Sequence, residues 1–280
     1  MSFVVANGVR LAYSTRGAGA DVVLLAPIGA PGTYWAAQIA ALAGHGFRTT
    51  SFAARGVPPS EVPPPPYSVR DLVADAAGLI EAIGVGPAFV VGHSLGAIIA
   101  QELALARPEL IRAAVLMGTL ARKDRVRREL ARRALTDLEA GVAPRASDVA
   151  VRALTMFGRD VLEDDEWMRV FFAQSEAAPQ PDSQAQRGLL GLQHASTAYD
   201  DRISILAAIR CPCLVIGFAE DLLVPATLSR EVAHAIPGAQ YVEVAGCGHG
   251  GPWERPDAVN DAVLAFLAAT ADPTSGGVVE

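Results

Sequence analysis

The stretch Phe89–Pro108, FVVGHSLGAIIAQELALARP, constrains the fold of this chain more than any other segment. It opens with a short apolar run typical of a buried strand, and it closes with strong helix formers that Pro108 terminates. The turn between them has little space, and Gly92 and Gly96 provide it because they lack a Cβ atom. Ser94 is therefore predicted to present its hydroxyl beside a helix N-terminus, where free N–H groups stabilise negative charge. Such a turn is a nucleophile elbow.

Ser94 also has a simpler interpretation. Serine is a preferred N-cap residue, so a serine between a strand and a helix can serve the helix alone. The pattern Gly-x-Ser-x-Gly at 92–96 is short enough to arise by chance. Whether Ser94 is structural or catalytic therefore depends on whether other parts of the sequence supply an acid and a base.

Composition narrows the class of protein. Of the 280 residues, 51% are hydrophobic and 19% charged, which indicates one large core carrying an insertion. A net charge of −7 argues against affinity for nucleic acid or an anionic membrane. No apolar run approaches the roughly 18 residues of a membrane span, and we expect no signal peptide because the first residues lack a charged leader. An odd cysteine count, three, suits a reducing cytoplasm.

The motifs of nucleotide, dinucleotide and zinc-protease sites are missing from the sequence. The three cysteines also lack zinc spacing, since no histidine or second cysteine pair accompanies them. We therefore expect neither a metal nor a cofactor.

Strands and helices alternate over most of the chain. Asn7-Gly8 predicts a hairpin turn between strands at 2–6 and 9–16. Further strands are expected at 22–26, 47–53, 89–91, 113–117, 213–217 and 240–244, and helices at 33–42, 68–83, 97–107, 225–235 and 257–269. This alternation predicts an α/β fold with a mostly parallel, eight-stranded sheet flanked by helices. The segments 55–66 and 246–256 are expected to be loops, the first exposed and stiff because of its prolines.

The alternation stops between residues 119 and 206. Four helical segments follow one another there, at 121–140, 146–158, 163–175 and 184–208. The sequence thus predicts a core built from 1–118 and 207–271, a helical insertion at 119–206, and a disordered tail at 272–280.

Two features of the insertion stand out. Its first helix holds seven of the 23 basic residues of the chain: Arg122, Lys123, Arg125, Arg127, Arg128, Arg132 and Arg133. A solvated helix face is the expected role, and a docking patch for an acidic partner such as a carrier protein is the alternative. Its densest large-apolar group contains Met156, Phe157, Trp167 and Phe171, which we expect to be partly core and partly the lining of a substrate pocket.

Two further polar residues follow strands of the predicted sheet. In parallel sheets the active site gathers at the carboxyl ends of the strands, and Ser94, Asp221 and His249 each follow one of them. Serine needs a base to remove its proton, and a carboxylate on the other imidazole nitrogen orients that base. Glu220 is the rival acid, but Asp221 is favoured because it lies one step further from the strand. His93, beside the nucleophile, is predicted to be a packing residue.

The sequence resembles the α/β-hydrolase family over nearly its full length. Four motifs carry the resemblance: RGVPPSEVPPPPYSVRDLVAD, VVGHSLGAIIAQELA, LVIGFAEDLLVP and AGCGHGGPWERPDAVN. Their wording is most similar to the cofactor-free, bromoperoxidase-like branch of serine hydrolases. The resemblance implies that Ser94, Asp221 and His249 form a catalytic triad and that 119–206 is a helical cap over the pocket.

The sequence departs from the family pattern in two places. Ala26-Pro27 stand where His-Gly is usual, and Ala53-Ala54-Arg55-Gly56 replace Asp-x-Arg-Gly. An oxyanion hole needs two N–H donors, which the resemblance assigns to Leu95 and to the loop after Leu25. Proline has no N–H, but the aligned donor is the next residue, Ile28, which keeps its own, so an oxyanion hole is still possible in a loop of altered shape.

These features predict a serine hydrolase that cleaves a carboxylic ester or thioester through an acyl-enzyme. Its partner would be a small apolar acyl substrate, and the enzyme would be a monomer or homodimer. A non-hydrolytic biosynthetic enzyme (a cyclase, lyase or acyltransferase) is the alternative, since the oxyanion loop is altered. Perhydrolase or haloperoxidase activity would be a side reaction of the same triad, and a non-catalytic binding protein would leave that triad unexplained.

Overall fold

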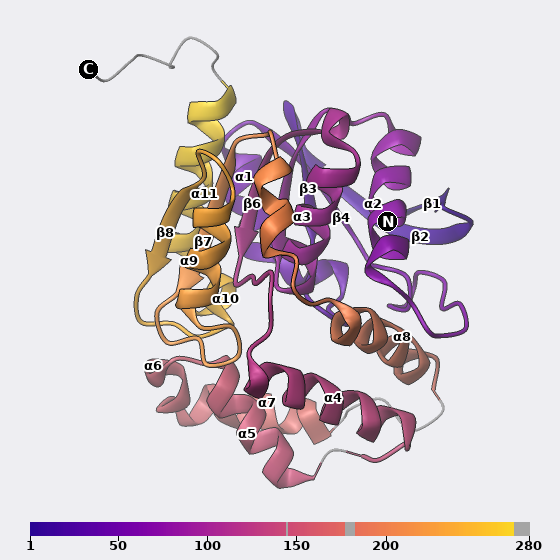
Figure 1. The fold of residues 1–280 in the computed structure, drawn as a ribbon, viewed down its shortest axis with the longest axis vertical. Helices are drawn as coiled ribbons and strands as arrows, with labels where there is room; N and C mark the ends of the chain where they lie inside the picture. Colours follow the sequence, from indigo (N-terminus) through magenta and orange to yellow (C-terminus); the bar gives the residue numbers. More distant parts are fainter. Residues whose placement is uncertain (144, 177–182, 272–280) are drawn as a thin grey trace.

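A computed structural model describes residues 1–143, 145–176 and 183–271, so the predicted tail at 272–280 lies outside the described residues. Its centre is one eight-stranded sheet of order β1-β2-β4-β3-β5-β6-β7-β8 (Figure 1). The strands are β1 (Ser2–Ala6), β2 (Val9–Gly17), β3 (Ala20–Leu25), β4 (Phe47–Phe52), β5 (Ala88–His93), β6 (Ile111–Met117), β7 (Cys213–Phe218) and β8 (Gln240–Val244). The pairs β1–β2 and β2–β4 are antiparallel and the other five are parallel, which confirms the predicted architecture.

Helices cover both faces of the sheet, so its central strands are buried on both sides. One face packs against α1 (Ala36–Gly44) and α11 (Pro256–Ala271), and Phe89 and Val91 of β5 lie in that half of the core. The other face packs against α2 (Val69–Ile83), α3 (Leu95–Ala106) and α9 (Ala226–Ala235), and Val90 lies in that half. This explains why the strand reads as a continuous apolar run without alternation.

Local signals place several element ends where they were predicted. Asn7 and Gly8 form the β1–β2 turn with positive φ values of 49° and 75°. Ser68 Oγ accepts from the Asp71 backbone N–H at 3.2 Å, and the Asp71 carboxylate accepts from the Ser68 N–H at 2.9 Å, which completes a capping box at α2. The predicted loop at 246–256 is wrong in one respect, because α10 (Gly251–Glu254) interrupts it with a short helix starting next to Pro252.

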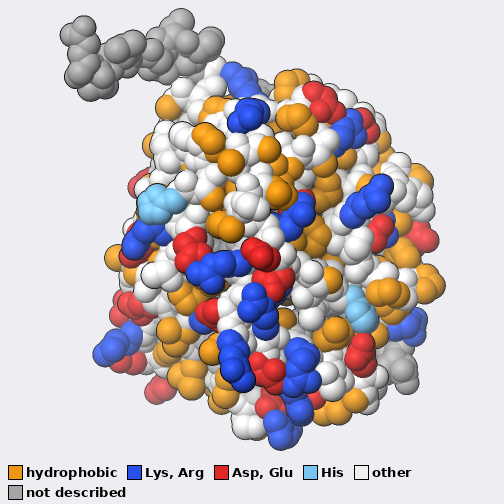
Figure 2. Space-filling view, in the orientation of Figure 1, with side chains coloured by type: hydrophobic (Ala, Val, Ile, Leu, Met, Phe, Trp, Pro, Cys, Tyr) orange, Lys and Arg blue, Asp and Glu red, His pale blue; other side chains and the backbone are white. Residues whose placement is uncertain are grey.

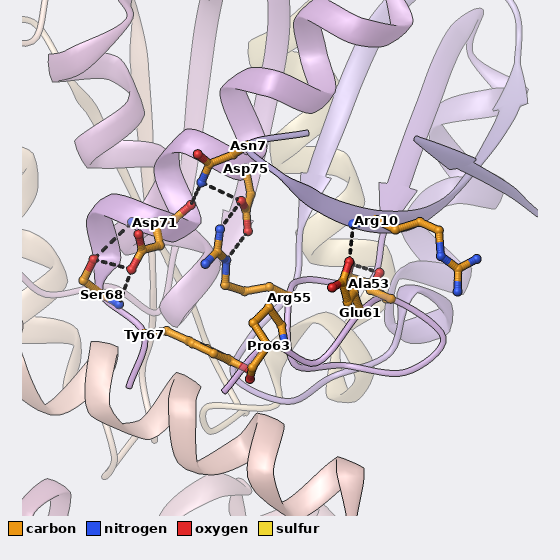
Figure 3. Close-up of polar contacts among 11 residues, drawn as sticks. Asn7, Arg10, Ala53, Arg55, Glu61, Pro63, Tyr67, Ser68, Asp71 and Asp75 are labelled. Atoms are coloured by element: carbon orange, nitrogen blue, oxygen red, sulfur yellow. Dashed lines mark hydrogen bonds and ion pairs between the residues drawn. The ribbon is translucent and has the colours of Figure 1, made fainter. Parts of the chain in front are cut away.

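The proline-rich segment 55–66 is less exposed than predicted. Arg55 is buried, and its guanidinium donates two hydrogen bonds of 2.6 Å to the Asp75 carboxylate on α2 (Figure 3). Asn7 donates to the same carboxylate at 3.0 Å (Figure 3). Ser60 is also buried, and its hydroxyl accepts from the Ala12 N–H and donates to the Ala53 carbonyl. Because these bonds satisfy the polar groups, the first half of the segment folds into the protein instead of projecting from it.

The helical insertion lies between β6 and β7 and gathers at one end of the molecule (Figure 1). Its helices are α4 (Arg125–Glu139), α5 (Ala146–Met156), α6 (Arg159–Leu162), α7 (Asp165–Glu176) and α8 (Gln184–Ala198). The predicted fourth segment, 184–208, is therefore two pieces: α8 and a 3₁₀ helix at Ile203–Ala208. Asp201 separates them with a φ of 49°, which an α-helix cannot contain. The domain limits at 119 and 206 stay a prediction.

The basic residues at the start of the insertion are largely paired. Five arginines form ion pairs with carboxylates: Arg122 with Glu231, Arg127 with Asp124, Arg128 with Asp200, Arg132 with Glu129 and Arg133 with Asp137. Lys123 is buried and donates to the Tyr199 carbonyl. Figure 2 shows basic and acidic side chains interleaved over the lower part of this face. The predicted helix at 121–140 starts later than expected, because α4 begins at Arg125 and leaves Arg122 and Lys123 before it; the buried Lys123 also departs from the predicted solvated face. The arginines of α4 itself lie among carboxylates in a mixed surface.

Candidate active site

Ser94 occupies the turn between β5 and α3 in a strained backbone conformation. Its φ is 55° and its ψ is −118°, values that non-glycine residues rarely adopt. The Ser94 carbonyl accepts from the N–H groups of Ala97 and Ile98, at 3.0 and 3.1 Å. The hydroxyl makes no capping hydrogen bond to the helix. Ser94 thus occupies the N-cap position of α3 through its backbone, but its hydroxyl does not cap the helix and is available for other chemistry.

Gly92 and Gly96 allow the tight packing of this turn. A Cβ atom added to Gly92 would lie 2.4 Å from the Gly96 carbonyl oxygen, so the strand and its own helix touch there as predicted. A Cβ atom added to Gly96 would lie 1.9 Å from the Leu25 carbonyl oxygen. The first turn of α3 therefore also lies directly against the end of β3, where the loop containing Ile28 begins.

Asp221 and His249 meet beside this turn. Asp221 follows β7 and His249 follows β8; each is 3% exposed, and His249 Nδ1 lies 2.7 Å from Asp221 Oδ2. The carboxylate thereby orients the ring and leaves Nε2 free to accept a proton. Glu220 does not contact the histidine: it is exposed, and its carboxylate accepts from the Arg159 backbone N–H of α6 at 2.7 Å.

The imidazole of His249 lies next to the residue that precedes Ser94. The ring centroids of His249 and His93 are 4.8 Å apart, and both rings converge over Gly118, which has no side chain to separate them. Among the described residues, Ser94 Oγ makes no hydrogen bond to His249. Catalytic hydrogen bonds are often long in the free enzyme and shorten when substrate binds.

His93 is buried behind the site. Its Nδ1 lies 2.7 Å from the Tyr34 hydroxyl, while Nε2 has no hydrogen-bond partner in the described part of the chain. Burial, together with the neighbouring His249, holds the pKa of His93 well below its usual value. The ring is therefore neutral and packs behind His249, in agreement with its predicted packing role.

The loop after β3 forms a turn that fits the predicted oxyanion hole. The Ala30 N–H donates to the Pro27 carbonyl at 3.1 Å, and Gly29 has a φ of 68°, the pattern of a type II turn with Ile28 at its second position. The backbone N–H groups of Ile28 and Leu95 have no hydrogen-bond partner among the described residues. Both N–H groups are therefore free to donate: Leu95 directly follows Ser94, and Ile28 lies in the loop whose start packs against the first turn of α3.

Comparison with known proteins identifies the family. A sequence family described as the alpha/beta hydrolase family matches residues 22–262. The chain belongs to the α/β-hydrolase family. One relative, named "Putative non-heme bromoperoxidase BpoC" from Mycobacterium tuberculosis, is 37% identical over 263 residues, which cover 93% of this chain and 98% of that protein. Another, named "Putative carbamate hydrolase RutD" from Klebsiella pneumoniae, is 37% identical over 259 residues, which cover 90% and 92%.

Solved structures agree with this α/β-hydrolase assignment. The crystal structure of BpoC from Mycobacterium tuberculosis matches with a TM-score of 0.83 and 38% identity, covering 93% of this chain and 96% of that one. The enol-lactonase from Burkholderia xenovorans matches with a TM-score of 0.84 and 27% identity, covering 95% and 100%. The resemblance predicted from the sequence motifs is confirmed.

The apolar group of the insertion is a compact cluster in this α/β-hydrolase. Phe157 is 2% exposed, and its ring lies 4.6 Å from Trp167 and 5.1 Å from Phe171, between centroids. Met156 contributes its carbonyl, which accepts from the Gly250 N–H at 3.0 Å. The cluster thus joins the insertion to the loop that carries His249. A role for these four residues in a substrate pocket stays a prediction.

One depression of about 540 Å³ borders this cluster on the outside. Phe157 lines it together with Leu154, Leu162 and Leu222, but none of Ser94, Ile28, Leu95 or His249 does. We therefore do not assign it as the substrate site. An apolar side chain nearer the site is Leu189 of α8, whose Cδ1 lies 3.3 Å from a Cβ atom built on Gly29.

Sequence reasoning missed three residues around this site of the α/β-hydrolase. Tyr34, Leu189 and Glu254 contact His93, the oxyanion loop and the His249 loop respectively. Only Glu254 lay inside a motif that carried the family resemblance, and the other two follow no pattern in the sequence.

Two further findings concern other kinds of site. Over 1–143, 145–176 and 183–271, no group of three or more His, Cys, Asp or Glu side chains is arranged to hold a metal ion. Within the same ranges, every helix is too short or too polar to span a membrane.

Proposed function

We propose that this protein is a serine hydrolase that cleaves a carboxylic ester or thioester through an acyl-enzyme. One observation carries the proposal: a strained elbow serine whose hydroxyl caps no helix lies beside a buried Asp221–His249 pair joined at 2.7 Å. A structural serine would use its hydroxyl locally, and a structural histidine would not need a buried carboxylate partner.

Each residue has a step in the reaction. His249 Nε2 takes the Ser94 hydroxyl proton while Oγ attacks the carbonyl carbon, and the Asp221 carboxylate stabilises the imidazolium that forms. The N–H groups of Ile28 and Leu95 hold the oxyanion. As the tetrahedral intermediate collapses, His249 returns the proton to the departing alcohol or thiol. His249 then takes a proton from a water molecule, whose oxygen attacks the acyl carbon. When this second intermediate collapses, the bond to Ser94 Oγ breaks, His249 returns the proton to Oγ, and the acid is released.

The substrate proposed is a small molecule with an apolar acyl group. The helical insertion would act as the cap over it, since Leu189 of α8 lies against the oxyanion loop. The enol-lactonase among the structural neighbours has a name that indicates a lactone, which is a cyclic ester.

A fluorophosphonate tests the nucleophile. We expect one covalent adduct per chain by intact-mass measurement, mapped to Ser94 by peptide sequencing, and no adduct on Ser94→Ala. A panel of activated esters and thioesters then identifies the acyl group by its turnover. Labelling at another residue, or none on folded protein, would contradict the proposal. Labelling of Ser94 with no turnover of any ester would instead favour a non-hydrolytic enzyme using the same site.

A perhydrolase activity is a second candidate, because a relative at 37% identity is named as a bromoperoxidase. Hydrogen peroxide in place of water would attack the same acyl-enzyme and release a peracid, which oxidises bromide. We expect bromination of a phenol-type dye to need both peroxide and a carboxylic acid or ester, and to disappear in Ser94→Ala. Bromination that survives this substitution would exclude the acyl-enzyme route.

A further inference from the structure

The helical insertion binds the loops that carry the acid and the base. Its residues 155–159, here called the clasp segment, connect α5 to α6. The Thr155 carbonyl accepts from the Leu223 N–H at 3.1 Å, on the loop that carries Asp221. The Met156 carbonyl accepts from the Gly250 N–H at 3.0 Å, on the loop that carries His249. Two consecutive carbonyls of the insertion therefore bind the two loops that carry Asp221 and His249.

The clasp segment and the His249 loop touch through their backbones. A Cβ atom added to Gly158 would lie 2.9 Å from Cys247 Cα, and one added to Gly248 would lie 2.6 Å from the Met156 carbonyl oxygen. Values under about 3 Å mean that only glycine fits at both positions. The two segments are therefore in direct contact, and a shift of one would displace the other.

One carboxylate joins these two backbones. Glu254 Oε2 accepts from the Gly158 N–H of the clasp segment at 2.7 Å, and Oε1 accepts from the Gly248 N–H at 3.1 Å. Gly248 immediately precedes His249. Both oxygens are needed, since each receives one donor, and a half-buried carboxylate with two N–H donors holds its geometry firmly.

We propose that Glu254 is a positioning residue that sets His249 within reach of Ser94 by fastening the His249 loop to the clasp segment. The inference rests on the proposed function, because it assigns His249 as the base. The insertion would then help to hold the catalytic residues in place, in addition to covering the substrate as a cap.

Glu220 provides a matched control. Its carboxylate accepts from the N–H of Arg159, the residue after Gly158, at 2.7 Å. Both acids therefore bind neighbouring N–H groups of the insertion, but only the Glu254 side chain also holds the residue before His249. Gln can keep the single bond that Glu220 accepts but not both bonds that Glu254 accepts, so Glu220→Gln controls for the loss of a negative charge beside the insertion.

The experiment compares Glu254→Gln with Glu220→Gln in the full chain. Gln keeps the size of Glu but offers one acceptor oxygen, so Glu254→Gln loses one of its two N–H bonds. We expect its kcat on an activated ester and its rate of fluorophosphonate labelling to fall by about 10- to 100-fold, the range for a misplaced catalytic group, while KM changes less than about threefold. Glu220→Gln should keep both rates within about twofold.

A spectroscopic readout makes the test independent of turnover. The His249 Nδ1 proton shared with Asp221 should give a low-field proton NMR signal, assigned by its absence in His249→Ala. We expect this signal to broaden or vanish in Glu254→Gln and to persist in Glu220→Gln. If the wild type neither turns over esters nor reacts with the fluorophosphonate, the proposed function fails, and this signal alone decides the positioning role.

Two results would overturn the inference. The first is a folded Glu254→Gln protein with unchanged kcat, labelling rate and low-field signal. The second is an equal loss in both Gln variants, which would show that the loss comes from removing a negative charge near the site and not from releasing the Gly248 N–H. Should Glu254→Gln fail to fold, Glu254→Asp keeps the charge but is too short to reach both donors, and the same losses are expected of it.

Discussion

At the scale of single residues, the site combines a buried acid–histidine pair with a serine whose hydroxyl has no partner among the described residues. Asp221 and His249 are almost completely buried and joined at 2.7 Å, while Ser94 has a strained backbone and an unused hydroxyl. Glu220, adjacent in the sequence to Asp221, faces the insertion instead. Two neighbouring acids thus have different roles because only one of them points toward the histidine.

The ranking of these two acids is the first prediction. Asp221→Asn should lower kcat by about 10⁴, the loss seen in serine-protease triads when the histidine takes the wrong tautomer. Glu220→Gln should cost less than about twofold. Steady-state kinetics on one activated ester measure both, and a larger loss at Glu220 would show that the acid has been misassigned.

The buried His93 predicts how stability depends on pH. The folded protein keeps this ring neutral, because burial holds its pKa well below the usual value, whereas the unfolded chain protonates it below about pH 6.5. The unfolded state then binds more protons, so the free energy of unfolding should fall as the pH is lowered from about 6.5 to 5. The contribution is up to about 1.4 kcal/mol per pH unit.

Urea unfolding of the wild type and of His93→Gln across this pH range measures that contribution. The variant cannot be protonated at this position, so its free energy of unfolding should fall less steeply with decreasing pH. Parallel curves for the two proteins would mean that His93 is protonated in the folded state as well.

At the scale of elements, the ends of four strands (β3, β5, β7 and β8) and the start of α3 form the site. The first turn of α3 lies against the end of β3, which brings the segment carrying the free Leu95 N–H next to the loop that carries the free Ile28 N–H. The turn that follows β3 has glycine at its third position and Ile28 at its second. Proline is favoured at that second position, so it fits the turn while removing the N–H.

Ile28→Pro should therefore fold and lower kcat by about 10²–10³, the effect of deleting one oxyanion donor. Ile28→Val keeps the N–H and should mainly change KM. Circular dichroism verifies the fold of both variants before their kinetics are compared. Full esterase activity in a folded Ile28→Pro protein would assign the oxyanion to another donor, with the Gly29 N–H as the next candidate.

At the scale of the whole molecule, buried polar contacts join segments that are distant in the sequence. The Arg55–Asp75 pair connects the loop after β4 to α2, and Asn7 adds the β1–β2 hairpin to the same carboxylate (Figure 3). Burial raises the pKa of Asp75 even though Arg55 opposes this, so removal from water outweighs the ion pair there. Removing only one partner of such a buried pair strongly destabilises the protein, because the remaining charge is left unpaired.

Arg55→Met should accordingly lower the free energy of unfolding by about 3–5 kcal/mol, since it leaves Asp75 buried without its partner. The double variant Arg55→Met/Asp75→Leu should recover most of that loss. Arg48 and Asp21 form a comparable two-bond pair nearer the surface, where water screens the charges and Arg48→Met should cost much less than Arg55→Met. Urea unfolding measures all three, and equal losses for Arg55→Met and Arg48→Met would contradict the prediction.

The sequence by itself determined the features that depend on neighbouring residues. Alternating apolar runs and turn residues predicted the eight strands, the Asn7-Gly8 turn and the Ser68 capping box, because these involve contacts within a few residues. The elbow at Ser94 was predictable for the same reason. The positions of Asp221 and His249 after two of the strands followed from the topology of parallel sheets, whereas the order of the strands in the sheet was known only from the structure.

Only the tertiary structure decided the features that arise where distant segments pack together. The burial of Arg55 depends on a carboxylate 20 residues away, and the two oxygens of Glu254 bind N–H groups in different parts of the chain, 96 and 6 residues away. The pairing of Tyr34 with His93 spans 59 residues. Such contacts have no local period, because the hydrogen-bonding partner is selected by the approach of whole elements and not by spacing along the chain.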